Sequence, residues 1–150
     1  DGVEPGDPDS CELTTANCMA AYRSLLGYFA GQPDTLFVVV TAPALVEPEA
    51  GIKSFIKNIL RPAGSPERVG WRARGFNNWL KDVENGWLKG YELNNVVVFD
   101  YYDILTGSGS SNWSVYPAGP TDSHPTSEGN SLAAREFVPF LNKALHRFGM

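Results

Sequence analysis

The sequence has no long apolar run, and this absence excludes one class of protein at once. Its longest stretch of large apolar side chains covers residues 36–40, whereas a membrane-spanning helix needs about 20 apolar residues. Basic residues are also few: 12 Lys and Arg stand against 17 Asp and Glu, for a formal net charge of -5. Because nucleic-acid binding needs a basic face, this charge argues against nucleic acid as a partner.

Cysteine and histidine are also scarce, and this leaves few ligands for a metal. Two cysteines, Cys11 and Cys18, and two histidines, His124 and His146, occur in the whole sequence. A structural zinc ion takes four such ligands, so we expect no metal and no other cofactor. The short loop between the cysteines favours a disulfide and, with it, a secreted or periplasmic protein. The alternative is two reduced thiols near the start of a helix.

What the sequence does contain is the composition of one folded domain. It has 150 residues, of which 43% are hydrophobic and 12% aromatic. This much apolar side chain excludes disorder as a description of the whole, and the length is typical of a single domain. Residues 1–11 are acidic and rich in Gly and Pro, so they are expected to form a tail or linker. Residues 12–150 form the predicted domain.

The apolar pattern predicts helices and strands in alternation. Helices are expected over residues 14–31, 49–60, 67–88 and 128–147, and strands over residues 36–41 and 95–100. Both strands are continuously apolar and flanked by helices, which is typical of parallel strands buried on both faces. The predicted fold class is therefore α/β with a parallel sheet. Since a stable sheet needs three or more strands, either weaker strands are hidden in the sequence or part of the sheet lies outside it.

The carboxyl ends of the predicted strands and one later loop are where chemistry is expected. Ligands of open parallel sheets bind at these strand ends, which carry residues 41–43 and 100–103. In the loop before the last helix, His124 is the one histidine that lies close to a carboxylate, Asp122. A carboxylate that fixes the imidazole tautomer makes a general base. The alternative is that Asp122 only caps the turn.

Two arginines on the predicted helix 67–88 form another candidate site. Arg72 and Arg74 could hold a carboxylate or a phosphate, since guanidinium groups bind both. The alternative is a solvated helix face, where such side chains add little to binding or stability.

The loop Asp122-Ser123-His124-Pro125, with Gly129 and a closing helix behind it, resembles the last conserved block of the SGNH, or GDSL-type, hydrolases. Further segments agree in order: residues 36–43, 72–74, 76–80 and 98–100. The resemblance covers most of residues 14–148. It implies a three-layer α/β/α sandwich around a parallel sheet, of the flavodoxin-like type. It also implies ester hydrolysis, with His124 as the general base. The family's acid stands three residues before the histidine, where this sequence has Thr121, and Asp122, two residues before it, is the candidate for that role.

The family's nucleophile motif, Gly-Asp-Ser, does not occur in the sequence. By the resemblance, the chain corresponds to the C-terminal part of an SGNH domain, with the first strands and the nucleophilic serine expected upstream of Asp1 or in a partner chain. The predicted function is hydrolysis of acyl or carbohydrate esters, and the chain alone is expected to be inactive. The alternative is a non-catalytic extracellular binding or structural module, in which aromatics such as Trp113 and Tyr116 bind sugar.

Overall fold

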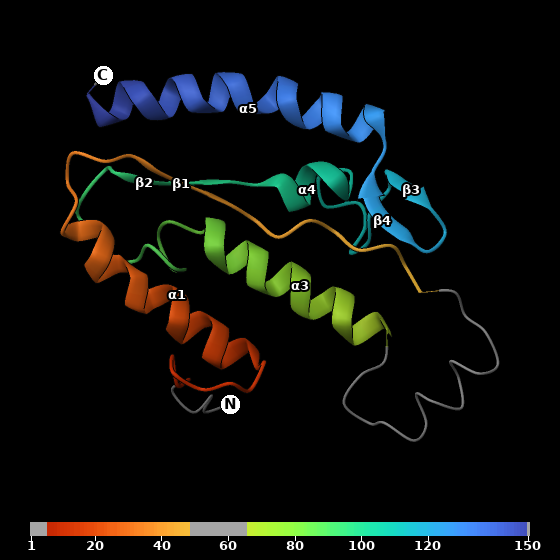
Figure 1. Ribbon diagram of the computed structural model, residues 1–150, viewed down its shortest axis with the longest axis horizontal. Helices are drawn as coiled ribbons and strands as arrows, with labels where there is room; N and C mark the ends of the chain where they lie inside the picture. The colour runs from red at the N-terminus through yellow and green to blue at the C-terminus, as the bar shows by residue number, and fades with distance from the viewer. Residues whose placement is uncertain (1–5, 49–65, 150) are drawn as a thin grey trace.

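The computed structural model describes residues 6–48 and 66–149, and within these ranges the fold is mixed α/β (Figure 1). The elements follow the chain in the order α1 Thr15–Ala30, β1 Phe37–Val40, α3 Pro66–Lys81, β2 Val96–Phe99, α4 Tyr101–Leu105, β3 Pro117–Gly119, β4 Asp122–Pro125 and α5 Ser127–Phe148. The α/β class predicted from the apolar pattern is confirmed. The helix expected over residues 49–60 and the start of the expected tail lie outside the described residues.

The two predicted strands pair in parallel, as expected. Phe37 lies opposite Val96, and Val40 lies opposite Phe99. The N–H of Phe37 donates to the carbonyl of Asn95 at 2.7 Å, just ahead of β2. A second small sheet, which the sequence reasoning did not predict, pairs β3 with β4 in antiparallel fashion. Each of the two sheets has two strands among the described residues.

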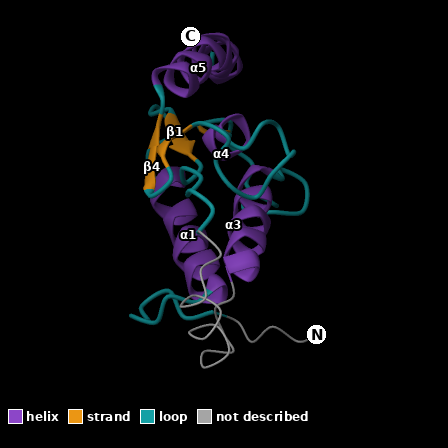
Figure 2. Cartoon of the chain, turned by 90° about the vertical axis from the view of Figure 1, so that its right-hand side faces the viewer, coloured by secondary structure: helices purple, strands orange, loops and turns teal. Residues whose placement is uncertain are grey.

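Helices lie on both sides of the parallel pair, with α1 and α3 on one side and α5 on the other (Figures 1 and 2). On the α1 and α3 side, Trp87 lies at the centre of a buried apolar cluster that includes Phe29 and Leu80. The indole N–H of Trp87 donates to the carbonyl of Tyr22 at 2.7 Å, so its one polar group is satisfied inside the core. The core therefore forms where helix and strand residues from distant parts of the chain converge.

On the α5 side, an aromatic contact holds the helix to the sheet. The ring of Phe99 lies 5.0 Å from that of Phe137 and 5.2 Å from that of Phe140, centroid to centroid. These distances fall in the favourable range for aromatic pairs. Phe99 ends β2, so this contact fixes the position of α5 relative to the carboxyl end of the strand.

Side-chain caps set where the long helices begin. Thr14 caps α1 by accepting the N–H of Asn17 at 3.1 Å. Thr126 caps α5 by accepting the N–H of Gly129 at 3.3 Å. Each cap satisfies one of the backbone donors that a helix start leaves unpaired.

The third helix ends earlier than the sequence predicts, at Lys81 and not near Leu88. The side chain of Asp82 accepts the N–H groups of Glu84 and Asn85, which stabilises a turn in place of another helical turn. Gly86 then packs so closely that a Cβ there would lie 2.0 Å from the carbonyl oxygen of Trp79. This tight turn returns the chain to the core at Trp87, and the apolar spacing gave no sign of it.

Cys11 and Cys18 are free thiols, so the disulfide prediction is wrong. A hydrogen-bonded side chain ties the N-terminal segment to α1 instead. Asn17 accepts the N–H of Asp7 at 2.9 Å and donates to the carbonyl of Glu12 at 3.0 Å. The argument for an oxidising compartment loses its support with the disulfide.

Across residues 6–48 and 66–149, none of the helices combines the length and the apolar character that crossing a membrane requires.

The central role of the α1 and α3 core gives the first prediction. Leu80 is buried in that cluster, so Leu80→Ala is expected to lower the free energy of unfolding by about 2–5 kcal/mol, because it leaves a cavity. Val138 is exposed on α5, and Val138→Ala is the control, with an expected change below about 0.5 kcal/mol. Urea denaturation followed by tryptophan fluorescence measures both. Equal effects of the two substitutions would contradict this account of the core.

Candidate functional site

The strand β4 brings the predicted pair, His124 and Asp122, into contact. Residues two apart on a strand point to the same side, and this pair does so. The Nδ1 atom of His124 lies 2.6 Å from Oδ1 of Asp122. The backbone N–H of His124 donates to the same oxygen at 3.0 Å. Asp122 therefore both stabilises the turn and holds the imidazole, so the two roles that the sequence left open coexist.

The contact fixes which imidazole nitrogen is available for chemistry. A carboxylate accepts hydrogen bonds, so Nδ1 carries the proton that faces Asp122. The other ring nitrogen, Nε2, then holds a lone pair that can accept a proton. The His124 side chain is 90% exposed, so this lone pair is open to solvent. The geometry is that of an oriented base on the surface.

The electrostatics of the pair favour a charged carboxylate. The pKa of Asp122 is lowered, first by the backbone N–H of His124 and then by the imidazole. Asp122 therefore stays ionised to a lower pH than an ordinary aspartate and remains available to stabilise a protonated imidazole. The pair is exposed, so its Coulombic attraction is strongly screened by water.

A nucleophile is not part of this pair among the described residues. The hydrogen bonds of His124 in the described ranges join it to Asp122, not to a hydroxyl or a thiol. The neighbouring Ser123 uses its hydroxyl oxygen to accept the N–H of Val46 at 3.0 Å. Ser123 therefore ties β4 to the segment after β1.

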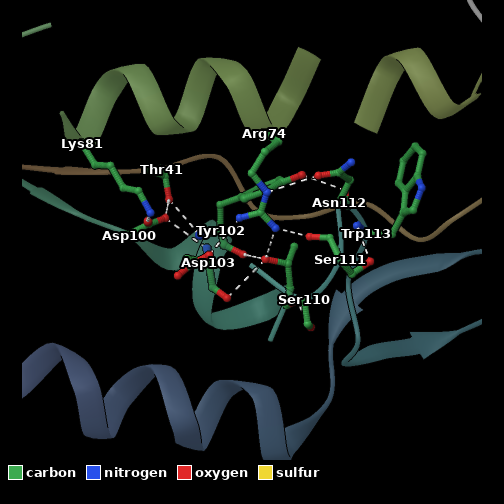
Figure 3. A network of polar contacts seen from close by, with 11 residues as sticks. Thr41, Arg74, Lys81, Asp100, Tyr102, Asp103, Ser110, Ser111, Asn112 and Trp113 are labelled. Carbon is green, nitrogen blue, oxygen red and sulfur yellow. Dashed lines mark hydrogen bonds and ion pairs between the residues drawn. The ribbon is translucent and has the colours of Figure 1, made fainter. Parts of the chain in front are cut away.

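The carboxyl ends of β1 and β2 meet, as parallel pairing requires, and their polar residues form one network (Figure 3). Thr41 follows β1 and donates to Oδ1 of Asp100, which follows β2, at 3.3 Å. The Thr41 hydroxyl also accepts the N–H of Tyr102 at 2.8 Å. Lys81, at the end of α3, lies 2.6 Å from Oδ2 of Asp100. The network thus joins both strand ends to the start of α4 and to the end of α3.

Arg74 is the centre of a second, more buried part of the network, shown in the same view (Figure 3). Its side chain is 11% exposed and forms an ion pair with Asp103 at 2.8 Å. Its remaining hydrogen bonds go to Asn112 at 3.2 Å, to the hydroxyl of Thr106 at 2.8 Å and to the carbonyl of Ser111. Its guanidinium group lies 4.8 Å from the ring centroid of Tyr102. Arg74 therefore does bind a carboxylate, but the carboxylate belongs to its own chain.

Tyr102 is a buried member of this network. Burial raises the pKa of the Tyr102 phenol, Arg74 opposes this change and Asp100 adds to it. The phenol O–H donates to the carbonyl of Asn112 at 2.7 Å. Arg74 and Tyr102 together fasten the polar segment 106–112 against α3 and α4. Sequence reasoning missed this role because the partners of Arg74 lie about 30 residues further along the chain.

A groove of 650 Å³ lies between α3 and the segment 108–112. Trp71, 63% exposed, lies on one side of it, and Asp103 and Asn112 are among its polar lining residues. On the loop side the backbone has positive φ angles at Gly107, Ser108 and Gly109, and for Ser108 this conformation is uncommon. The groove therefore pairs an exposed aromatic surface with polar groups of both charge signs.

Metal ligands do not gather in the described part of the chain. No three His, Cys, Asp or Glu side chains there lie close enough together to hold a metal ion.

Comparison with known proteins gives no relative for this chain: no protein-family model, no curated protein and no solved structure matches it. The resemblance to SGNH hydrolases therefore rests on the sequence segments quoted above and stays a prediction.

The enclosure of Arg74 yields a stability prediction. Arg74→Ala is expected to lower the free energy of unfolding by about 2–4 kcal/mol, because Asp103 is left without its partner in a partly buried place. Arg74→Lys is expected to recover little of the lost stability, because one ammonium group cannot make the several hydrogen bonds of the planar guanidinium group. Urea denaturation measures the change, and hydrogen exchange of residues 106–112 should rise with it. Arg72→Ala, an exposed substitution on the same helix, is the control.

The lowered pKa of Asp122 yields a titration prediction. Because the backbone N–H of His124 is the largest cause and its imidazole the second, His124→Ala should leave part of the lowering, and His124→Pro, which lacks both groups, should leave less of it. The stabilisation that goes with the lowered pKa is present above the unfolded-state pKa and is lost as the pH falls through the folded-state pKa. Carbon-13 NMR of the Asp122 carboxyl follows the titration in all three proteins. An equal rise in both variants would show that the imidazole, not the backbone, is the main cause.

Proposed function

We propose that this chain carries the general base of an ester hydrolase, with His124 as the base and Asp122 as the carboxylate that orients it. The observation that carries the proposal is the 2.6 Å contact between Nδ1 of His124 and Oδ1 of Asp122. The contact directs the lone pair of Nε2 away from the carboxylate, which is the arrangement that proton removal from a hydroxyl requires. The substrates proposed are acyl or carbohydrate esters.

The proposed reaction has two halves, and His124 serves both. A serine hydroxyl gives its proton to Nε2 as its oxygen attacks the acyl carbon, and the imidazolium then protonates the departing alcohol. Water next attacks the acyl-enzyme, again losing a proton to Nε2, and the serine leaves with that proton. The ionised Asp122 stabilises the imidazolium that forms in each half.

In this proposal the serine comes from a segment or a partner chain outside the described residues. Two features support an incomplete site. The His124 side chain is 90% exposed, whereas catalytic bases usually work where water is excluded. The outer edge of β1 also has no paired strand among the described residues, and Val40, in this apolar strand, is 48% exposed. Further strands at this edge would extend the sheet toward the α/β/α sandwich of the SGNH hydrolases.

The test measures ester hydrolysis by the protein expressed from its complete gene, together with any chain that copurifies. With 4-nitrophenyl acetate as substrate, His124→Ala is expected to lower kcat/KM by about 10²–10⁴-fold, the usual contribution of a general base. The fold should be unchanged by circular dichroism, because the side chain lies at the surface. His146→Ala, which removes the other histidine, is the control and should leave kcat/KM unchanged.

A fluorophosphonate label should react with the activated serine, and mass spectrometry of the labelled peptide would locate it. No hydrolysis in the native protein, or full hydrolysis after His124→Ala, would contradict the proposal. The second candidate function, binding without catalysis, would then have the stronger support. It is favoured by the groove beside Trp71, because an exposed indole next to polar groups suits a sugar ring.

A further inference from the structure

A second groove, of 390 Å³, follows the free edge of β2. Three consecutive strand residues, Val96, Val97 and Val98, line it. One of its walls comes from α5, through residues such as Phe140, and the other from the chain after α3, through residues such as Val83. Among the described strands, β2 pairs with β1 alone, so this side of β2 has no neighbour in its sheet. The groove is therefore an uncovered strand edge between two walls.

The backbone of β2 presents to this groove hydrogen-bonding groups that have no partner among the described residues. The N–H groups of Phe37 and Thr41 donate to the carbonyls of Asn95 and Phe99, so residues 95, 97 and 99 direct their polar groups toward β1. Because these groups alternate along a strand, the N–H and C=O groups of Val96 and Val98 point the other way. They face the groove and offer two donors and two acceptors to an added strand.

The walls of the groove are largely apolar, and the charged side chains that line it in the described part of the chain are cations. Val83 is 65% exposed there, and Leu93 is also exposed. Lys81, Lys143 and Arg147 line the groove, and no carboxylate from residues 6–48 or 66–149 does. Lys81 is already paired with Asp100, whereas Lys143 and Arg147 have no ion pair in the described part of the chain. The groove is therefore locally positive, although the chain as a whole has a net charge of -5.

We propose that this edge of β2 is a docking site for an extended segment of a partner protein, in which apolar and acidic residues alternate and which joins the sheet as a strand. The apolar side chains would cover the Val83 wall, and the acidic ones would pair with Lys143 and Arg147 on α5. An acyl chain fits less well, because it would bury the N–H and C=O groups of Val96 and Val98 without hydrogen bonds. Addition of a strand satisfies them, as in other cases of recognition at a sheet edge.

This docking site is separate from the base proposed above. His124 precedes the first turn of α5, whereas Arg147 lies in its last turn, and α5 has 22 residues. A helix of that length spans about 33 Å. The two proposals can therefore fail independently, and His124→Ala should leave peptide binding unchanged.

The test uses a fluorescein-labelled peptide of alternating valine and glutamate, with binding to the full chain measured by fluorescence anisotropy. Two matched peptides carry N-methyl groups on alternate amides, one on the odd positions and one on the even positions. A strand uses only one of these sets toward its neighbour, so one methylated peptide should bind at least about tenfold more weakly and the other should bind normally.

Charge reversal on α5 is the second arm of the test. The double variant Lys143→Glu and Arg147→Glu should bind the glutamate peptide at least about tenfold more weakly. It should also bind a valine–lysine peptide more tightly than the unchanged protein does. Arg135→Glu is the control, because Arg135 is exposed on the same helix but does not line the groove.

Three outcomes would overturn the proposal. The first is no binding of the glutamate peptide at millimolar concentration. The second is equal binding by both methylated peptides, which would exclude a strand ladder. The third is a dimer by sedimentation velocity that occupies the edge and is abolished by the double variant, which would make a second copy of this chain the occupant.

Discussion

The parallel pairing of β1 with β2 is the constraint on which the other features depend. Because both strands run the same way, Thr41 and Asp100 emerge at one end of the sheet and bond to each other. Asp100 then pairs with Lys81 and accepts the N–H of Asp103 at the start of α4. The ring of Phe99 packs against Phe137 of α5, on the other face of the sheet from α3 (Figure 1). The same pairing leaves alternate backbone groups of β2 facing outward. One register thus determines the polar network, the position of α5 and the free edge.

Features set by neighbouring residues were predictable from the sequence, and those set by distant contacts were not. The two strands of the parallel pair depend on local apolar runs, and both were predicted. The end of α3 depends on the turn at Asp82 and on the close approach of Gly86 to Trp79, and the apolar spacing reveals neither. The β3–β4 hairpin was not predicted, because its strands are short and have prolines at paired positions. Proline is rare inside strands.

The candidate site divides in the same way. Asp122 and His124 are two residues apart, so a strand is enough to bring them together, and the sequence could predict the contact. Arg74 was predicted either to bind an external anion or to face solvent. Its partner Asp103 lies on α4, a helix that the sequence reasoning did not predict. The position of an arginine on a helix does not reveal its partner when that partner is supplied by an unpredicted element.

Two of the three ion pairs in the described part of the chain differ in what they contribute, and this difference bears on function. The Arg74–Asp103 pair is largely enclosed and joins three parts of the chain, so the stability of the fold accounts for it. The His124–Asp122 pair is exposed, and exposed pairs add little to stability. The turn at Asp122 requires only the backbone N–H of His124, not its imidazole. The side-chain contact adds the orientation of Nε2, which is the orientation that proton transfer to an imidazole requires.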